Sequence, residues 1–248
     1  MENTLLVGLS RQEALRRSLD VISNNVANMN TTGFKADGLV LEEFTMPSAR
    51  ESSGAGVGRR ISYVTDRATW HDHRQGVIQQ TGNPLDVAIE DRGFLTVQTP
   101  RGERYTRNGA LQINAAGELV TSEGLRVQGE QGPITLQPQD RAIMIGRDGT
   151  ITTSGGNRGR LRVVDFAQPG RLQKDGSTLF QAPAGVAPQP LPQARVQQGA
   201  LEKSNVQPVV EMTRLIDVTR TYSAIAQLAQ SQSDLRRSAI DKLADVPA

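Results

Sequence analysis

Both ends of the 248-residue chain carry apolar residues at helical spacing, and this feature constrains the fold more than any other. The residues on this three-to-four spacing are Leu5, Leu15, Leu19, Ile22 and Val26 near the N-terminus, and Val218, Tyr222, Ile225, Leu228 and Leu235 near the C-terminus. A single amphipathic helix cannot remove its apolar stripe from water. The two ends must therefore pack on each other, on neighbouring copies, or on both, which favours an assembly subunit over an enzyme.

The first helix is predicted to begin near Asn3 or Thr4 and to end near Ala27 or Asn28. Residues that favour turns follow it directly. Gly33 lies among them and is expected to adopt the left-handed conformation that ends a helix. The chain should thus leave this helix through a tight, hydrogen-bonded exit.

The last helix is predicted to follow Ser204 and Asn205, either of which could cap it, and to run to about Leu243. Pro208 would be tolerated in its first turn because the first amide groups of a helix lack partners anyway. Its middle is rich in Ala, Ser and Gln, which allow helices to approach closely. These side chains could serve contacts between subunits or packing against the first helix.

The middle of the chain shows a β pattern. Residues 34–75 are irregular and predict a linker or extended arm, whose most flexible part would be 52–58 (SSGAGVG). From 76 to 199, short alternating runs are separated by turn signals, which predicts antiparallel strands. Glycines at four expected hairpin turns are Gly102, Gly117, Gly124 and Gly149. The Pro- and Ala-rich run 182–192 is interpreted as a semi-rigid connector leading out of this domain.

The predicted fold class is therefore α+β. It consists of an N-terminal helix (1–33), a linker or extended arm (34–75), a β-rich central domain (76–199) and a C-terminal helix (200–248). The two terminal helices are expected to pair as a coiled coil.

Composition excludes several functions. The 28 basic and 26 acidic residues nearly balance, and no basic cluster exceeds a pair, so nucleic-acid binding is not expected. The chain has no cysteine, which excludes disulfides and cysteine nucleophiles. The first residues lack the apolar run of a cleaved secretory signal, and without further information the cytoplasm would be the default location.

No catalytic or cofactor site is predicted. His71 and His73 could present both rings on one face of a strand as a metal pair, but no third ligand is indicated, so an ordinary solvated strand is favoured. The glycines of 54–58 imitate part of a dinucleotide loop, yet no apolar strand precedes them and no helix follows. Trp70 and Tyr63 are expected to pack the domain rather than to bind a ligand.

One segment carries a specific signature. It consists of Ala27, Asn28, Met29, Asn30, Thr31, Thr32, Gly33, Phe34 and Lys35. This segment resembles the signature of the bacterial flagellar rod, hook and hook-associated family. The resemblance continues through 81–89 (TGNPLDVAI), 105–109 (YTRNG) and 199–206 (GALEKSNV), and covers nearly the whole chain.

The resemblance implies an axial structural subunit of the flagellar basal-body rod. In this family the terminal helices pair as a coiled coil that lines the inner tube, so the ten apolar residues of the two ends would form the helix seam. The implied partners are further copies and other axial rod proteins, and the type III export apparatus, with no nucleic acid, cofactor or small-molecule substrate.

The implied location is the periplasmic rod, reached without a cleaved signal peptide, which replaces the cytoplasmic default. Because such export passes unfolded chains, the lack of cysteine is consistent with it. The single β-domain and the terminal residues resemble the proximal rod type, with the distal rod type as the alternative. Outside the family, the alternative is a free-standing adhesin-like β-domain with helical tails.

Overall fold

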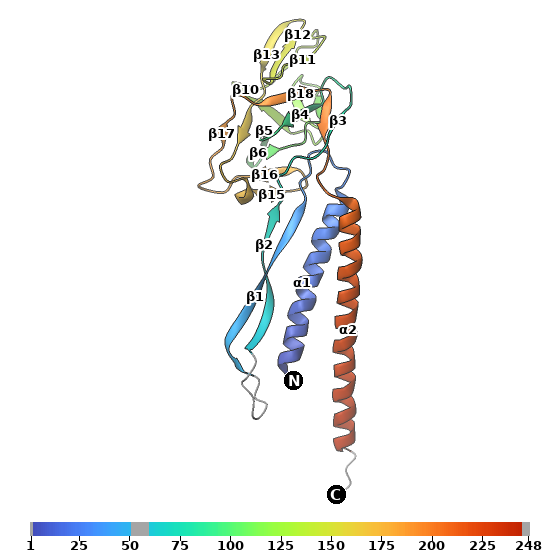
Figure 1. The fold of residues 1–248 in the computed structure, drawn as a ribbon. Coiled ribbons are helices and arrows are strands. Elements are labelled where there is room, and N and C mark those ends of the chain that lie inside the picture. Colours follow the sequence, from blue (N-terminus) through green and yellow to red (C-terminus); the bar gives the residue numbers. More distant parts are fainter. Residues whose placement is uncertain (1, 51–59, 245–248) are drawn as a thin grey trace. The chain divides into compact units, whose positions relative to one another are not determined.

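The computed structural model describes the backbone of residues 2–50 and 60–244, and the side-chain surroundings of 7–40, 68–235 and 237–240. The chain divides into two compact units (Figure 1). The terminal unit comprises Met1–Val26, Asp37–Trp70 and Pro208–Ala248, and the central unit comprises Ala27–Ala36 and His71–Gln207. The central unit therefore extends beyond the predicted 76–199 at both ends.

The terminal unit contains two helices and two strands. Helix α1 spans Glu2–Ala27, and α2 spans Pro208–Ala244, close to the predicted bounds. No proline interrupts α1, and the proline of α2 occupies its first position, where a missing amide hydrogen costs nothing. Within the part of the chain that the structure describes, no helix is long and apolar enough to cross a membrane.

The predicted linker contains regular structure. Strands β1 (Asp37–Arg50) and β2 (Arg60–His71) pair as a two-stranded sheet, so most of 34–75 is not irregular as the sequence suggested. Backbone pairing satisfies the polar groups that the two strands turn towards each other, and it does not require a strongly alternating apolar pattern. The predicted flexible run 52–58 lies outside the described residues.

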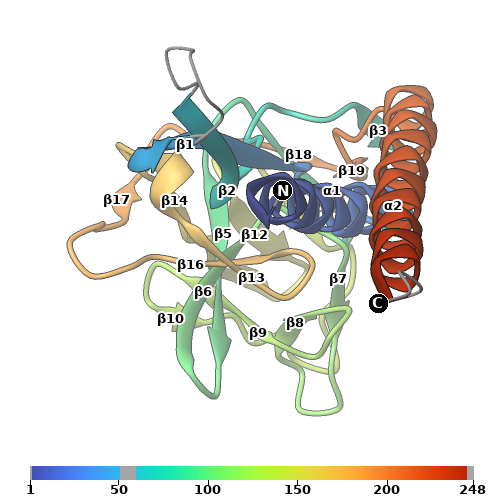
Figure 2. The ribbon, with the colours of Figure 1, turned by 90° about the horizontal axis from the view of Figure 1, so that it is seen from below.

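The central unit is built from antiparallel strands, as predicted. In its ten-stranded sheet one path runs β15-β16-β6-β5-β9-β8-β7, with β10 beside β9, β14 beside β5, and β17 beside β14; Figure 2 shows part of this sheet from below. These strands are β5 (Phe94–Thr99), β6 (Gly102–Thr106), β7 (Leu111–Ile113), β8 (Leu119–Thr121), β9 (Arg126–Gly129), β10 (Gly132–Pro133), β14 (Val163–Asp165), β15 (Gln173–Asp175), β16 (Leu179–Gln181) and β17 (Gln189–Pro190). The four glycines predicted at hairpin turns all have positive φ.

Three smaller sheets complete the unit. They are β18-β4, β19-β3 and β11-β12-β13. Their strands are β3 (Ile78–Gln80), β4 (Val87–Glu90), β11 (Met144–Ile145), β12 (Thr150–Thr153), β13 (Gly156–Arg160), β18 (Arg195–Gln198) and β19 (Ala200–Glu202). A short 3-10 helix, Pro169–Arg171, lies between β14 and β15.

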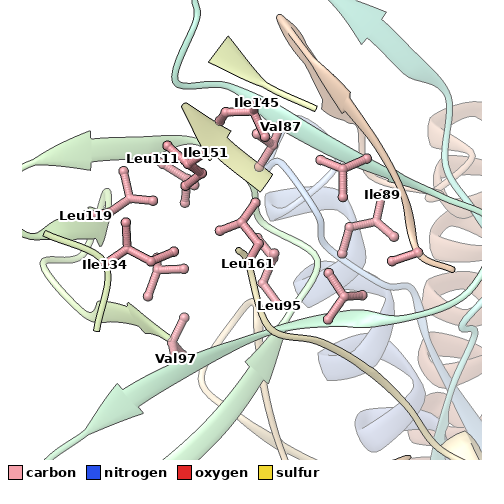
Figure 3. Close-up of a cluster of buried hydrophobic side chains, with 14 of the residues drawn as sticks. Val87, Ile89, Leu95, Val97, Leu111, Leu119, Ile134, Ile145, Ile151 and Leu161 are labelled. Carbon is pink, nitrogen blue, oxygen red and sulfur yellow. The ribbon is translucent and has the colours of Figure 1, made fainter. Parts of the chain in front are cut away.

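Two clusters form the core of the central unit. The larger is aliphatic, and Figure 3 shows its side chains, among them Leu95, Val97 and Leu161, gathered in one region. The smaller is mainly aromatic and includes Phe94 and Phe180. Because side chains alternate along a strand, β5 places Phe94 in the aromatic cluster and Leu95 and Val97 in the aliphatic one.

The run 182–192 is part of the central unit rather than a connector leaving it. Ala182 and Val186 pack against the aromatic cluster, and β17 pairs with β14. The chain then adds β18 and β19 before α2 begins. The prediction of a connector was therefore wrong. The prolines of this run are compatible with a place in the domain because they lie at an edge strand and in loops, where no hydrogen bond between strands is lost.

Candidate functional site

Three charged side chains from distant parts of the chain meet in the interior of the central unit. Lys35, Arg107 and Glu202 each leave at most 5% of their surface exposed, and we call them the Glu202 cluster. The Lys35 ammonium lies 2.6 Å from Glu202 Oε1, and the Arg107 guanidinium lies 3.1 Å from Glu202 Oε2. The Gly76 amide also donates to Glu202 Oε1, at 2.9 Å. One carboxylate thus binds segments near residues 35, 76 and 107.

The sheet explains why Glu202 points inward. Strand β19 pairs with β3, and its side chains alternate, so Ala200 and Glu202 are buried while Leu201 is partly exposed. Arg107 directly follows β6, and its guanidinium also donates to the carbonyls of Ile89 and Asp91.

Burial affects both cations. It lowers the pKa of Lys35, while Glu202 opposes this shift through its charge and its hydrogen bond. Burial also lowers the pKa of Arg107, again opposed mainly by Glu202. Removing one member of such a buried pair costs about 3 to 5 kcal/mol, because the remaining charge loses its partner away from water. Substitution of any one member of the Glu202 cluster is therefore expected to destabilise the central unit.

The signature segment that follows α1 docks at the same place. Gly33 has φ +70°, which confirms the predicted left-handed conformation, and its amide donates to the Glu202 carbonyl at 2.8 Å. A Cβ atom at Gly33 would lie only 2.3 Å from the Asn108 backbone nitrogen. Phe34 is fully buried, and the Lys174 ammonium lies 3.7 Å from its ring centre. Only glycine fits the approach at position 33.

The remaining signature residues shape the exit from α1. The Thr31 amide and hydroxyl bond the Asn28 carbonyl and side-chain oxygen, and the Phe34 amide donates to the Thr31 carbonyl. Asn28, Thr31 and Thr32 are partly buried, whereas Ala27 and Asn30 are exposed. The exit is thus the predicted hydrogen-bonded turn.

Asn205 does not cap α2. Helix α2 begins three residues later, and the Asn205 side chain accepts from the Ala36 amide and donates to the Asp72 and Arg74 carbonyls, all within 2.8 to 3.0 Å. These long-range bonds satisfy its amide group more fully than one cap bond would. Sequence reasoning found the residue but assigned it the wrong partner.

A related contact lies within the terminal unit and was missed. The buried Asn25 side chain donates to the Asp37 carbonyl and accepts from the Asp37 amide, at 2.8 and 2.9 Å. This pair of bonds ties the last turn of α1 to the start of β1. No sequence signal singled out Asn25, because at about 100° per residue it lies about 60° beyond Ile22, outside the predicted apolar stripe.

The predicted seam residues differ in burial, and their pairing across the two helices stays a prediction. Ile22 is buried, while Leu15, Leu19, Val26, Val218, Tyr222 and Ile225 are partly buried. Leu228 and Leu235 are 59% and 70% exposed, and the side chain of Leu5 lies outside the described residues. Leu228 and Leu235 point about 80° and 100° around the helix from Val218, so they leave the face that includes Ile225.

Both helices line one pocket of the terminal unit. This pocket of about 300 Å³ includes Ile22 of α1, Glu211 and Val218 of α2, and Trp70 of β2. Trp70 packs its indole closely against Gly38, as expected of a packing residue, although it stays 47% exposed. Tyr63 and the glycines of 54–58 lie where no side-chain surroundings are described.

His71 and His73 join the aromatic cluster. The His73 ring lies 5.2 Å from that of Phe180 and 5.7 Å from that of Phe94, and the His71 ring lies 5.7 Å from that of Phe180. Among the described residues, no three His, Asp or Glu side chains come together as metal ligands would. His73 follows the end of β2, so the two histidines do not share a strand face as supposed.

Comparison with known proteins finds related flagellar family models at both ends and in the middle of the chain. Three family models match: “Flagella basal body rod protein” at 5–35, “Flagellar hook protein FlgE/F/G D1 domain” at 88–153, and “Flagellar basal body rod FlgEFG protein C-terminal” at 197–242. The flagellar basal-body rod protein FlgF of Caulobacter vibrioides is 38% identical over 99% of this chain and 100% of its own length. The chain belongs to the flagellar basal-body rod protein family.

Two further relatives of this rod family bear different names. A FlgF of Mesorhizobium japonicum is 33% identical over 98% of both chains, and a FlgG of Bacillus subtilis is 28% identical over 97% of this chain and 99% of its own length. The matched terminal segments contain Lys35 and Glu202, two members of the Glu202 cluster. In this rod-family chain, the parts matched by different family models thus meet at one buried site.

Proposed function

We propose that this chain is a structural axial subunit of the proximal rod of the bacterial flagellar basal body. It polymerises through its terminal helices with further copies and with other axial rod proteins, transmits torque and encloses the export channel. Membership of the rod family supports this function over an enzyme and over the adhesin-like alternative. The relatives named FlgF support the proximal rather than the distal rod type.

One observation carries the proposal: none of the apolar side chains described on α2 is buried, and several are exposed. Among its described side chains only Glu211 is buried. Leu215, Val218, Tyr222 and Ile225 are partly buried along one face. A long helix with so little support gains stability only by packing on other helices.

The same helix carries further apolar side chains that no described contact covers. Val209, Met212 and Ile216 are exposed at i, i+3 and i+7 and therefore form a second stripe. Leu228, Leu235 and Ile240 are exposed further along. Exposed apolar surface of this extent marks protein interaction sites.

The two terminal helices are proposed to form a coiled coil that is completed only in the polymer. In the free subunit the ends would be disordered, and they would become helical on assembly. Hydrogen exchange of a dilute subunit should then show fast amide exchange over residues 7–26 and 208–240. Full protection of both helices in a dilute subunit would contradict this part of the proposal.

The location follows from the same assignment. The subunit is proposed to leave the cytoplasm through the flagellar type III export apparatus without a cleaved signal peptide and to function in the periplasmic rod. The absence of cysteine in all 248 residues supports export of an unfolded chain, since no disulfide can obstruct passage.

The test of the function uses the exposed residues of α2. The double variant Leu228→Ser, Leu235→Ser should leave the unfolding free energy of the free subunit within about 0.5 kcal/mol, because both residues are exposed. In a strain lacking the gene, the variant should be absent from purified basal bodies and should not restore swimming. The matched control is Gln227→Ser, an exposed polar position of the same helix, which should restore both.

Normal incorporation of the double variant would show that these residues do not serve assembly. Swimming by the strain without the gene would reject the rod function itself. Density for this chain in an image of the assembled basal body would separate the proximal from the distal position.

A further inference from the structure

The chain passes four times between its two units, and the central-unit sides of these passages are bonded to one another. The passages follow residues 26, 36, 70 and 207. The Asp72 amide donates to the Ala36 carbonyl at 2.8 Å, and the Ala36 amide donates to Asn205 Oδ1 at 2.8 Å. Asn205 Nδ2 donates in turn to the Asp72 carbonyl at 2.8 Å. Three of the four passages are therefore joined through one asparagine.

The fourth passage is held by the same group of segments. Residues 27–35 lead out of α1, and their Gly33 amide bonds the Glu202 carbonyl. Behind it, the Lys35 ammonium and the Gly76 amide share Glu202 Oε1. The bonds to Glu202 thus involve segments that are close in sequence to all four passages.

The two units differ in how well they are supported. Phe34 and the Glu202 cluster are fully or nearly fully buried in the central unit, whereas α2 has one buried side chain among those described. Local stability follows the number of buried contacts and protected hydrogen bonds. The segments around the Glu202 cluster should therefore remain folded under conditions in which α1 and α2 open.

We propose that the Glu202 cluster and Asn205 are positioning residues that hold the segments after the end of α1 and before the start of α2 together in the free subunit, before either helix is stably formed. The folded part of the free subunit then includes 27–36, 71–77 and 200–207, in addition to the β-domain. This inference rests on the proposed rod function only in that the helices become ordered on assembly.

The device would reduce the entropic cost of assembly. Lys35 and Glu202 are 167 residues apart in sequence, and closing such a loop costs conformational entropy. If the loop is closed when the β-domain folds, the segments that lead to the end of α1 and to the start of α2 are already joined, at a high effective concentration, when the subunit reaches a growing rod.

Hydrogen exchange of the full-length, dilute subunit tests the proposal directly. The amides of Gly33, Phe34, Ala36, Asp72 and Lys203 should be protected like those of β5 and β6, while those of α1 and α2 exchange fast. Exchange of these five amides as fast as those of the helices would overturn the proposal.

Variants test the positioning role. Glu202→Gln should speed exchange at Gly33, Phe34 and Asp72 by about tenfold or more, which corresponds to about 1.4 kcal/mol, with β5 and β6 still protected. The matched control is Glu103→Gln, which removes a carboxylate whose ion pair with Arg162 is more than one-third exposed. It should leave these amides unchanged, and an unchanged Glu202→Gln variant would refute the role of the cluster.

A second variant covers the case in which Glu202→Gln unfolds the central unit. Asn205→Ala removes the bonds to the Ala36 amide and to the Asp72 carbonyl without creating an unpaired buried charge. It should speed exchange at the Ala36 amide, and at the Asp72 amide that donates to the Ala36 carbonyl, while the β-domain stays protected. Unaltered exchange there would overturn the proposal.

The outcome also separates this inference from the rod function. If these amides are protected but basal bodies do not contain the subunit, the rod function is rejected and the positioning role is still supported. If basal bodies contain the subunit but the amides around Glu202 are unprotected, the rod function is supported and the positioning role is rejected.

Discussion

Replacing Gly33 by alanine should destabilise the central unit for two separable reasons. The backbone at Gly33 has φ +70°, a conformation that costs a residue with a side chain about 1 to 2 kcal/mol. The new Cβ would also lie 2.3 Å from the Asn108 nitrogen and 2.4 Å from the Arg107 carbonyl carbon. Neither neighbour is the end of a flexible side chain, so backbone must shift, and such overpacking costs about 1 to 3 kcal/mol.

The expected loss in the free energy of unfolding is therefore roughly 2 to 5 kcal/mol, measured by urea denaturation followed by circular dichroism. The control is Gly124→Ala. Gly124 has φ +81° but no atom within 4 Å of its would-be Cβ, so only the backbone cost applies. The difference between the two variants isolates the close approach of the helix exit to residues 107 and 108. Equal losses in the two variants would refute the reasoning.

Three further predictions concern the central unit. Phe34→Ala should lower the free energy of unfolding by about 3 to 5 kcal/mol in urea denaturation, because a fully buried aromatic side chain is removed and Lys174 loses its ring contact; a loss below 1 kcal/mol would show that the segment is not docked. Burial, reinforced by neighbouring cationic groups, lowers the pKa of His73 from 6.5 to about 4, so the unfolded chain binds more protons in this window and stability should fall as the pH drops from 6.5 towards 4. The His73→Phe variant should reduce this slope in denaturation curves at several pH values, and an unchanged slope would assign it to other groups. The hydrogen bond from Arg158 is the main reason that the pKa of Asp140 falls from 3.8 to about 2, so its contribution to stability is present above pH 3.8 and is lost towards pH 2; in Arg158→Gln the NMR-measured pKa of Asp140 should return towards 3.8, and a pKa that stays near 2 would contradict the assigned cause.

Local features of the fold were predictable because they depend on neighbouring residues. The turn residues after α1 and the left-handed Gly33 follow from intrinsic backbone preferences, and the structure confirms them. Gly102 and Gly117 mark hairpin turns for the same reason. The signature segment also identified the family before any contact was known, which the comparisons confirm.

The candidate site was predictable only in its parts. Arg107 and Glu202 both lie in segments that resemble the family, yet nothing in their spacing indicates that they share a buried ion pair with Lys35. Asn205 looks like a helix cap in sequence because asparagine favours that position, and it is instead a long-range bridge. The seam prediction extended to Leu228 and Leu235 because apolar character alone does not show which face of a long helix is covered.

The sequence by itself determined the α+β class, the approximate limits of both terminal helices, the turns of the β-domain and membership of the rod family. Each of these depends on short-range pattern or on motif identity. Only the tertiary structure decided that residues 27–36 and 200–207 belong to the central unit, and that Lys35, Arg107 and Glu202 pair there. The physical reason is that a buried ion pair forms only where the fold brings its charges together. Lys35 and Glu202 are 167 residues apart, so the local sequence around either residue does not indicate their contact.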